Sequence, residues 1–355
     1  MVKPDRGGIF THVMIIKFSV PFVMVSVLFV ATCAHSQQTV EPLKLVQTIP
    51  MPGLKDGDFD HFTADYADHL LFLAAEENGV VEVFDLNTNA LIHSITGLDS
   101  PHSMVYRPEL KKLFVVDGDA NEIRIYQGPS FTPAGTIKGL PACDSMAYDP
   151  ATKYMYVING GSDAGLSYSF VSVVDTTAEK KLADIRLDAD EVEAVTLETK
   201  GPLMYVNLRS KAAIAVVNRD TRTVVATWSI ASEGKTNVPM AFDEADHRLF
   251  VATEDPGKVI FLNSNTGKIL NTMPGGSNTD DAYWDPALRR LYVAGVPNIS
   301  VYHLIGPNRF RILGQVPSAW HGMTGILIPQ LNRYYVAESH HGQTPAQVLV
   351  YDVVP

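Results

Sequence analysis

The sequence predicts an all-β protein: a seven-bladed β-propeller with four antiparallel strands per blade, whose ring is closed by the N-terminal strand completing the last blade. Three observations predict this fold. A segment with a central aromatic residue recurs seven times, the rest of each repeat has strand periodicity, and the two ends of the chain complement each other.

The recurring segment is an apolar strand pattern. It appears as "DHLLFLAA" (68–75), "LKKLFVVD" (110–117), "TKYMYVIN" (152–159), "GPLMYVNL" (201–208), "DHRLFVAT" (246–253), "LRRLYVAG" (288–295) and "LNRYYVAE" (331–338). Its central aromatics are Phe72, Phe114, Tyr156, Tyr205, Phe250, Tyr292 and Tyr335. Neighbouring aromatics lie 42 to 49 residues apart, and a fixed period of this size is typical of repeat architectures such as propellers.

Each repeat has room for four strands. An apolar segment ending in a turn, such as "SMAYDP" (145–150), precedes the aromatic strand. A third strand such as "VSVVDTT" (171–177) follows a polar loop, and a fourth such as "KLADIRL" (181–187) ends the repeat. Val, Ile, Tyr, Phe and Thr at period two, with turns about every eight to twelve residues, indicate β-structure throughout.

The ends of the chain predict how the ring closes. The seventh repeat stops at its third strand, "QVLVYDVVP" (347–355), and a spare strand, "LKLVQTIPM" (43–51), precedes the first repeat. An N-terminal strand that completes the last blade leaves no open sheet edge. A solenoid of stacked sheets, the competing architecture, would not need this exchange.

The first 36 residues predict a secretory signal peptide, and residues 37–355 the propeller. Lys17 is followed by the apolar run "FSVPFVMVSVLFVATCAHS" (18–36), which ends in small residues. A membrane anchor is the competing interpretation, although the run is short for a span of roughly 20 residues. A lipoprotein form with its lipid on Cys33 is a further alternative. We therefore expect a periplasmic or secreted protein.

The net charge limits the partners that the chain is expected to bind, and the cysteine content limits its disulfides. Loss of residues 1–36 would remove Lys3, Arg6 and Lys17 against Asp5 and change the formal net charge from −11 to −13. Such a chain repels nucleic acid and acidic membrane surfaces. Cys143 would remain as the single cysteine, so no internal disulfide is expected. We expect a monomer.

The repeats resemble the YVTN-type propellers, the YncE-like family of exported bacterial proteins. The likeness covers roughly residues 43–353 and rests on an aromatic-Val pair in the second strand, as in "MYVNL", and on "VSVVDTT"-like third strands. The tetrapeptide YVTN itself is absent. The resemblance implies a seven-bladed propeller in the periplasm or outside the cell. It implies no single activity, because related propellers include lactonases, a metal-dependent antibiotic lyase and scaffold subunits.

Polar residues gather where the first strands begin. Twelve residues before each central aromatic stand Asp60, His102, Asp144, Glu193, Val238, Asp280 and Met323. In a propeller these positions surround the upper mouth of the central channel, together with the loops that follow the second strands. Neighbouring positions add His61, Asp281 and His321, and the loops add Glu338, the base Arg209 and further acids such as Glu76. Alternation along a strand favours Asp60 facing the channel and His61 pointing away, unless a bulge turns His61 inward.

Polar residues could line the mouth only because it is exposed to solvent. Besides this explanation, two functions fit their distribution. The first is binding of a small molecule or a partner protein; the candidate residues are Asp60, His61, His102, Asp144, Glu193, Arg209, Asp280, Asp281, His321 and Glu338. The second is a metal-assisted lyase or lactonase that uses blades 7, 1 and 2, with a divalent metal ion as cofactor. Its expected metal ligands are His61, His102 and His321. Metal binding, or its absence, would separate the two.

Overall fold

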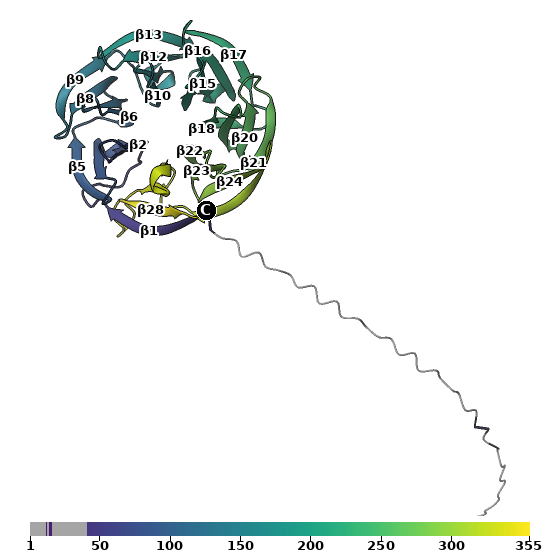
Figure 1. The fold of residues 1–355 in the computed structure, drawn as a ribbon. Helices are drawn as coiled ribbons and strands as arrows, with labels where there is room; N and C mark the ends of the chain where they lie inside the picture. Colours follow the sequence, from purple (N-terminus) through teal and green to yellow (C-terminus); the bar gives the residue numbers. More distant parts are fainter. Residues whose placement is uncertain (1–11, 13, 16–40) are drawn as a thin grey trace, which may run out of the picture. The chain divides into compact units, whose positions relative to one another are not determined.

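The computed structural model describes residue 12, residues 14–15 and residues 41–355. The expected signal peptide lies, apart from those three positions, outside the described residues. Residues 41–355 form seven four-stranded antiparallel sheets arranged in a ring (Figure 1). The predicted all-β, seven-bladed propeller is thereby confirmed. Among the described residues no helix has the length and hydropathy needed to cross a membrane.

Within each blade the strands follow one another outwards from the channel. Blade 1 comprises β2 (Phe62–Asp65), β3 (Leu70–Ala75), β4 (Val80–Asp85) and β5 (Ala90–Thr96); blade 2 comprises β6 (Pro101–Arg107), β7 (Lys112–Asp117), β8 (Glu122–Gln127) and β9 (Thr132–Lys138). Blade 3 comprises β10 (Met146–Asp149), β11 (Tyr154–Gly160), β12 (Ser169–Asp175) and β13 (Lys180–Leu187); blade 4 comprises β14 (Val195–Leu197), β15 (Leu203–Leu208), β16 (Ala213–Asn218) and β17 (Thr223–Ser229).

The last three blades repeat the plan. Blade 5 comprises β18 (Lys235–Asp243), β19 (Arg248–Asp255), β20 (Gly257–Asn263) and β21 (Ile269–Pro274); blade 6 comprises β22 (Thr279–Asp285), β23 (Arg290–Gly295), β24 (Asn298–Gly306) and β25 (Arg309–Pro317); blade 7 comprises β26 (Gly325–Ile328), β27 (Arg333–Glu338), β28 (Gln347–Val353) and β1 (Leu43–Pro50). The helical segments described are single 3₁₀ turns: η1 (Glu76–Asn78), η2 (Ser162–Ala164), η3 (Arg209–Lys211) and η4 (Pro329–Leu331).

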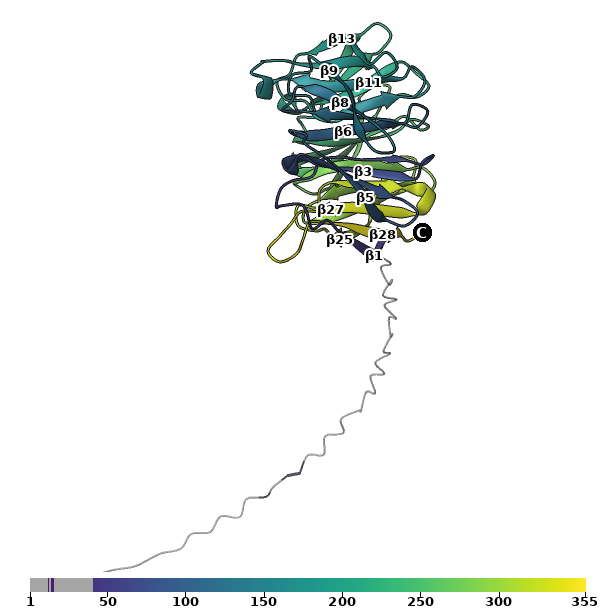
Figure 2. The same ribbon diagram turned by 90° about the vertical axis from the view of Figure 1, so that its left-hand side faces the viewer.

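The N-terminal strand closes the ring as predicted. β1 pairs antiparallel with β28, from Leu43 opposite Val353 to Pro50 opposite Gln347, and the two strands lie side by side in both views (Figure 1, Figure 2). Leu43 and Ile49 are buried. The chain ends are therefore joined by a backbone ladder and by apolar packing, which leaves blade 7 with the same four strands as the others.

The central aromatic of each repeat lies in the second strand of its blade and packs between blades. All seven are buried: Phe72, Phe114, Tyr156, Tyr205, Phe250, Tyr292 and Tyr335. Phe72 contacts Tyr106 and Phe131 of blade 2, with ring centroids 5.5 and 5.6 Å apart. Tyr335 packs with residues of blade 1 in the same way. The strict recurrence of this residue in the sequence thus reflects one repeated contact that joins each blade to the next.

Candidate functional site

A β-bulge at the start of the first strands determines what faces the channel mouth. In blade 1, the Asp60 N–H donates to the Ala74 carbonyl (3.0 Å) and the Ala74 N–H donates to the His61 carbonyl (3.2 Å), so two residues oppose one. Blade 3 repeats this with Asp144 and Ser145 opposite Ile158. An extra residue of this kind breaks the strict alternation of side chains.

The same feature recurs around the ring. In blade 4, Asn207 opposes both Glu193 and Ala194. In blades 2, 5 and 6 the ladder register shifts by one residue between Pro101 and Met104, between Asn237 and Met240, and between Thr279 and Ala282. Each shifted segment contains the position that the sequence places at the mouth, His102, Val238 or Asp280, and in blade 6 also Asp281. The mouth therefore receives two consecutive side chains from a blade where simple alternation supplies one.

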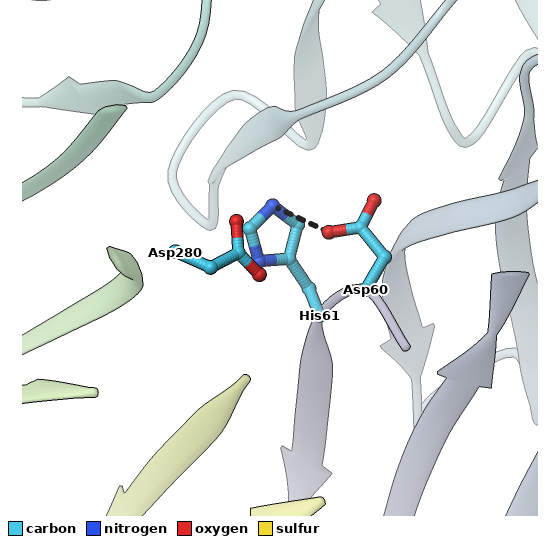
Figure 3. A group of neighbouring side chains, drawn as sticks. All are labelled: Asp60, His61 and Asp280. Atoms are coloured by element: carbon cyan, nitrogen blue, oxygen red, sulfur yellow. Dashed lines mark ion pairs between the residues drawn. The ribbon is translucent and has the colours of Figure 1, made fainter. Parts of the chain in front are cut away.

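In blade 1 the bulge brings both Asp60 and His61 to the mouth, whereas unbroken alternation would turn His61 away. Nδ1 of His61 lies 3.0 Å from Oδ1 of Asp281 in blade 6. Nε2 lies 3.1 Å from the Ser145 hydroxyl in blade 3 and 3.3 Å from Oδ1 of Asp60. His61 thus reaches across the channel mouth from blade 1 (Figure 3). Although burial of the ring lowers it, the carboxylates of Asp60 and Asp281 hold the pKa of His61 well above its usual value.

His102 of blade 2 is the second imidazole at the mouth. Its Nδ1 lies 2.5 Å from Oδ2 of Asp60 and 3.5 Å from Oδ1 of Asp144. Its Nε2 lies 3.3 Å from the Ser100 hydroxyl and 4.0 Å from Oε1 of Glu76. Burial opposes protonation of the ring, but the hydrogen bond and charge of Asp60 raise the pKa of His102 to about 10. Asp60 therefore stands between two imidazoles, one on each carboxylate oxygen.

Asp60 itself is buried, with 7% of its surface exposed. Burial alone would raise the pKa of the Asp60 carboxyl, yet the neighbouring His61 and His102 lower it below the usual value. Asp60 is thus stabilised as a carboxylate by the two imidazoles. This pairing of a buried carboxylate with two histidines is the most tightly connected part of the mouth.

In contrast to Asp60, the remaining acids of the mouth have carboxyl groups whose pKa is raised. Burial and neighbouring carboxylates raise the pKa of Glu76 to about 7 and that of Glu193 to about 7. For the same reasons the pKa of Asp144 is raised, and that of Asp280 lies well above the usual value. Such shifts arise where several carboxyl groups share one site without enough positive charge among them.

Arg209 is the guanidinium group of the mouth. It follows β15 in η3, and its Nη1 lies 2.7 Å from Oε1 of Glu193. Its Nη2 lies 3.6 Å from Oε2 of Glu254 in blade 5. Arg209 therefore pairs with the acids of blades 4 and 5, on residues separate from those that contact Asp60.

A cavity of about 720 Å³ lies beside Arg209 and Lys211, and two smaller cavities adjoin the other groups of the mouth. One of about 280 Å³ lies between blades 3 and 4 and is lined by polar groups that include Asp144, Asn159, Asp163, Glu193 and Arg209. The other, of about 270 Å³, is lined by first-strand residues of blades 1 to 6. Its wall combines His61, Asp280 and Asp281 with apolar side chains such as Met104, Met146, Met240 and Tyr283. The cavity between blades 3 and 4 is thus mainly polar, whereas the cavity between the first strands is partly apolar.

His321 and Glu338 lie apart from the Asp60 cluster. Nδ1 of His321 pairs with Asp58, and the His321 ring stacks on Trp320 with centroids 4.8 Å apart. Glu338 accepts a hydrogen bond from the Gln347 side chain in its own blade. In the part of the chain that the structure describes, His61 and His102 meet at Asp60, and His321 contacts neither of them.

The groups with metal-ligand geometry differ accordingly from the three expected histidines. Two sets of three residues have potential ligand atoms that all lie within 4.8 Å of one another: Asp60, His61 and Asp280, and Asp60, Glu76 and His102. Figure 3 shows the first set, with the Asp280 carboxylate directed towards the His61 ring. Sequence reasoning places Glu76 among the loop acids but does not single it out. Ser100 and Ser145, which orient the imidazoles, carry no recognisable signal in the sequence.

Solved structures resemble this chain in fold. No family model and no curated protein matches the sequence. A chain in the crystal structure of the mitotic checkpoint complex superposes with a TM-score of 0.74 at 15% identity, covering 97% of this chain and 99% of that chain. A chain of Kuenenia stuttgartiensis hydrazine synthase superposes with a TM-score of 0.68 at 14% identity, covering 81% of this chain and 94% of that one. Together with the sheet topology, these likenesses establish the chain as a seven-bladed β-propeller.

Proposed function

We propose that this chain is an exported propeller of the YncE-like type that binds a small, positively charged ligand at the upper mouth of its channel. The observation that carries the proposal is the imbalance of charge at the mouth. Among the described residues, carboxyl groups from blades 1, 3, 4, 5 and 6 outnumber the basic groups paired with them, the Arg209 guanidinium and the imidazoles of His61 and His102. A cation in their midst would relieve the repulsion among them.

The size of the site favours a small molecule or ion over a folded partner. The two cavities, of about 280 and 270 Å³, lie just below the range of about 300–1,000 Å³ that is usual for small-molecule sites. A loop of a partner protein that presents a Lys or Arg side chain is the corresponding protein ligand. The apolar N-terminal run and the acidic net charge support export and disfavour nucleic acid.

Thermal unfolding with a panel of charged small molecules tests this function. Divalent ions and alkylammonium compounds should raise the melting temperature of the wild-type protein, and carboxylic acids of similar size should not. Asp280→Asn should weaken the effect. Asp220→Asn is the matched control, because Asp220 is exposed in the turn between β16 and β17, outside the residues that form the mouth. Stabilisation by anions instead of cations would contradict the proposal.

A metal-assisted lyase or lactonase is the second candidate function. It is favoured by the position of His61 and Asp280, which belong both to a set with metal-ligand geometry and to the wall of the 270 Å³ cavity. A divalent ion there would polarise a substrate carbonyl or lower the pKa of a bound water, and an imidazole would move the proton. Turnover of lactone substrates that depends on added metal, and that His61→Gln abolishes, would separate catalysis from binding.

A further inference from the structure

Asp60 has an unusual position between the two imidazoles. Oδ1 of Asp60 lies 3.3 Å from Nε2 of His61, whereas Oδ2 lies 2.5 Å from Nδ1 of His102. The carboxylate is buried and is held by the bulge opposite Ala74. Each oxygen therefore faces a different imidazole. A carboxylate that bridges two metal ions likewise places one oxygen on each side, and both imidazoles belong to sets of potential ligand atoms.

The first oxygen belongs to a set with Asp280. Potential ligand atoms of Asp60, His61 and Asp280 all lie within 4.8 Å of one another (Figure 3). Asp281 contacts the other ring nitrogen of His61 at 3.0 Å and accepts a hydrogen bond from the Gly325 N–H at 3.0 Å. A histidine that binds a metal through one nitrogen almost always donates its other N–H to such a fixed carboxylate or carbonyl.

Asp280 is positioned as well. Its Oδ2 accepts a hydrogen bond of 3.2 Å from the Thr324 hydroxyl of blade 7. The same O–H is shared with the Phe59 carbonyl, 2.9 Å from the hydroxyl oxygen, which fixes the hydroxyl next to the chain that carries Asp60. This first set is thus oriented by groups of blades 6 and 7 that are not themselves ligands.

The second oxygen belongs to a set with Glu76. Potential ligand atoms of Asp60, Glu76 and His102 also lie within 4.8 Å of one another. The Ser100 hydroxyl lies 3.3 Å from both Oε1 of Glu76 and Nε2 of His102 and ties the two side chains together. Oδ1 of Asp144, 3.5 Å from the His102 ring, adds a further carboxylate at the edge of this set.

We propose that the mouth holds a pair of divalent transition-metal ions bridged by Asp60. One ion takes His61 and Asp280 and the other takes His102 and Glu76, each with one oxygen of Asp60. This inference rests on the proposed binding of a cation at the mouth and names that cation.

The donors decide the class of metal. One imidazole and two carboxylates for each ion suit Mn²⁺, Fe²⁺ or Zn²⁺, whereas Ca²⁺ and Mg²⁺ prefer oxygen donors alone. The paired carboxylate-bridged sites of ferritin-like bundles use a similar set, with one histidine and several carboxylates for each ion. Two ions about 3.5–4 Å apart also form the usual two-metal arrangement for stabilising an attacking and a leaving oxygen.

Metal stoichiometry and electron paramagnetic resonance test the pair. Protein stripped with chelator and titrated with Mn²⁺ should bind two ions per chain and give a spin-coupled signal. Glu76→Gln and Asp280→Asn should each retain one ion and give the six-line signal of an isolated Mn²⁺. Asp60→Asn should weaken binding of both ions at least 100-fold. Glu77→Gln is the matched control, because Glu77 is the exposed neighbour of Glu76 in η1, and it should keep two coupled ions.

The outcomes distinguish this inference from the function on which it rests. One uncoupled ion in the wild type, or a coupled pair that survives Asp60→Asn, would overturn the bridge by Asp60. A coupled pair that survives both Glu76→Gln and Asp280→Asn would overturn the proposed ligand sets. If no metal binds but alkylammonium compounds still stabilise the protein, the metal pair is wrong and the cation site stands. If neither binds, both are wrong. Should Asp60→Asn fail to fold, as judged by circular dichroism in chelator, the two single-ion variants carry the test.

Discussion

His61 of blade 1 and Asp281 of blade 6 are 220 residues apart in the sequence, yet Nδ1 of His61 lies 3.0 Å from Oδ1 of Asp281 at the channel mouth. Asp281 is buried and accepts a second hydrogen bond, from the Gly325 N–H of blade 7. Three blades thus meet at this carboxylate. The contact fixes the His61 ring so that Nε2 is directed to Asp60 and Ser145.

We predict that Asp281→Asn weakens metal binding at the mouth by about 10- to 100-fold, because the amide holds the His61 ring less firmly and lowers its basicity. The variant should also lose about 1–3 kcal/mol of unfolding free energy, since it disturbs a buried hydrogen-bonded group. Calorimetric titration with Mn²⁺ and thermal unfolding measure the two effects.

Asp220→Asn removes the same charge at an exposed turn and should leave both quantities unchanged. Wild-type affinity in Asp281→Asn would show that the His61–Asp281 contact only supports the fold. Loss of stability without loss of affinity would have the same meaning.

Because β1 closes the ring, truncating its buried and its exposed leucine should lower the unfolding free energy by very different amounts. Leu43 is 1% exposed and packs between blades 6 and 7, whereas Leu45 is 50% exposed. Leu43→Ala should therefore cost about 2–5 kcal/mol of unfolding free energy, and Leu45→Ala less than about 0.5 kcal/mol. Denaturant unfolding of the two variants compares them directly.

Removal of residues 37–50 should destabilise the protein more than Leu43→Ala does. It exposes the edge of β28 and uncovers the apolar contacts of blade 7. A truncated protein that melts near the wild-type temperature would refute the closure.

The fold could be predicted from the sequence because each blade repeats one packing problem. An aromatic such as Phe72 or Tyr335 must fill the gap to the next blade, so it recurs at a fixed period and marks the second strand. The closing strand was equally visible, since the last repeat lacks a strand that the N-terminus supplies. These patterns are local in the sequence, so they can be recognised without knowledge of distant contacts.

The mouth could be predicted only in part. Counting from the aromatics places Asp60, His102 and Asp280 at or just before the start of the first strands, because the spacing to the central aromatic is the same in these blades. The bulge that turns His61 inward depends on the backbone hydrogen bonds of Asp60 and His61 with Ala74. No residue type in this segment predicts that pattern. The pairing of His321 with Asp58 likewise depends on how a loop of blade 7 lies against blade 1.

The pH dependence of stability should report on Glu193. Its pKa is raised to about 7 by burial and by the charge of Asp144, even though Arg209 pairs with it. The folded protein therefore binds this proton more tightly than the unfolded chain. The resulting stabilisation is fully present below about pH 4.5 and is lost as the pH rises through 7, by on the order of 3 kcal/mol.

Glu193→Gln mimics the protonated carboxyl and should flatten this dependence. Its melting temperature should match the wild type near pH 4.5 and exceed it by a few degrees at pH 8. Asp220→Asn serves as the control for the loss of one acid. Melting curves of wild type and Glu193→Gln that stay parallel from pH 4.5 to 8 would contradict the assignment.

Arg209 provides the prediction that separates a cationic from an anionic ligand. Its guanidinium lies 2.7 Å from Glu193 and borders the same cavity as Asp144. Arg209→Met keeps the length of the side chain and removes the charge. If the mouth binds a cation, loss of this repulsion should raise the affinity for Mn²⁺ or an alkylammonium ion about tenfold, the change expected for a charge several ångströms away at intermediate dielectric.

The same substitution has the opposite consequence for an anion, because Arg209 would then be the group that holds the ligand. Calorimetric titration of wild type and Arg209→Met with one cation and one carboxylate therefore decides the sign. Lys211→Met is the matched control: it removes a positive charge two residues away in η3, on a side chain that does not line the cavity shared by Asp144 and Glu193. Weaker cation binding in Arg209→Met, with Lys211→Met unchanged, would exclude the charge imbalance as the basis of recognition.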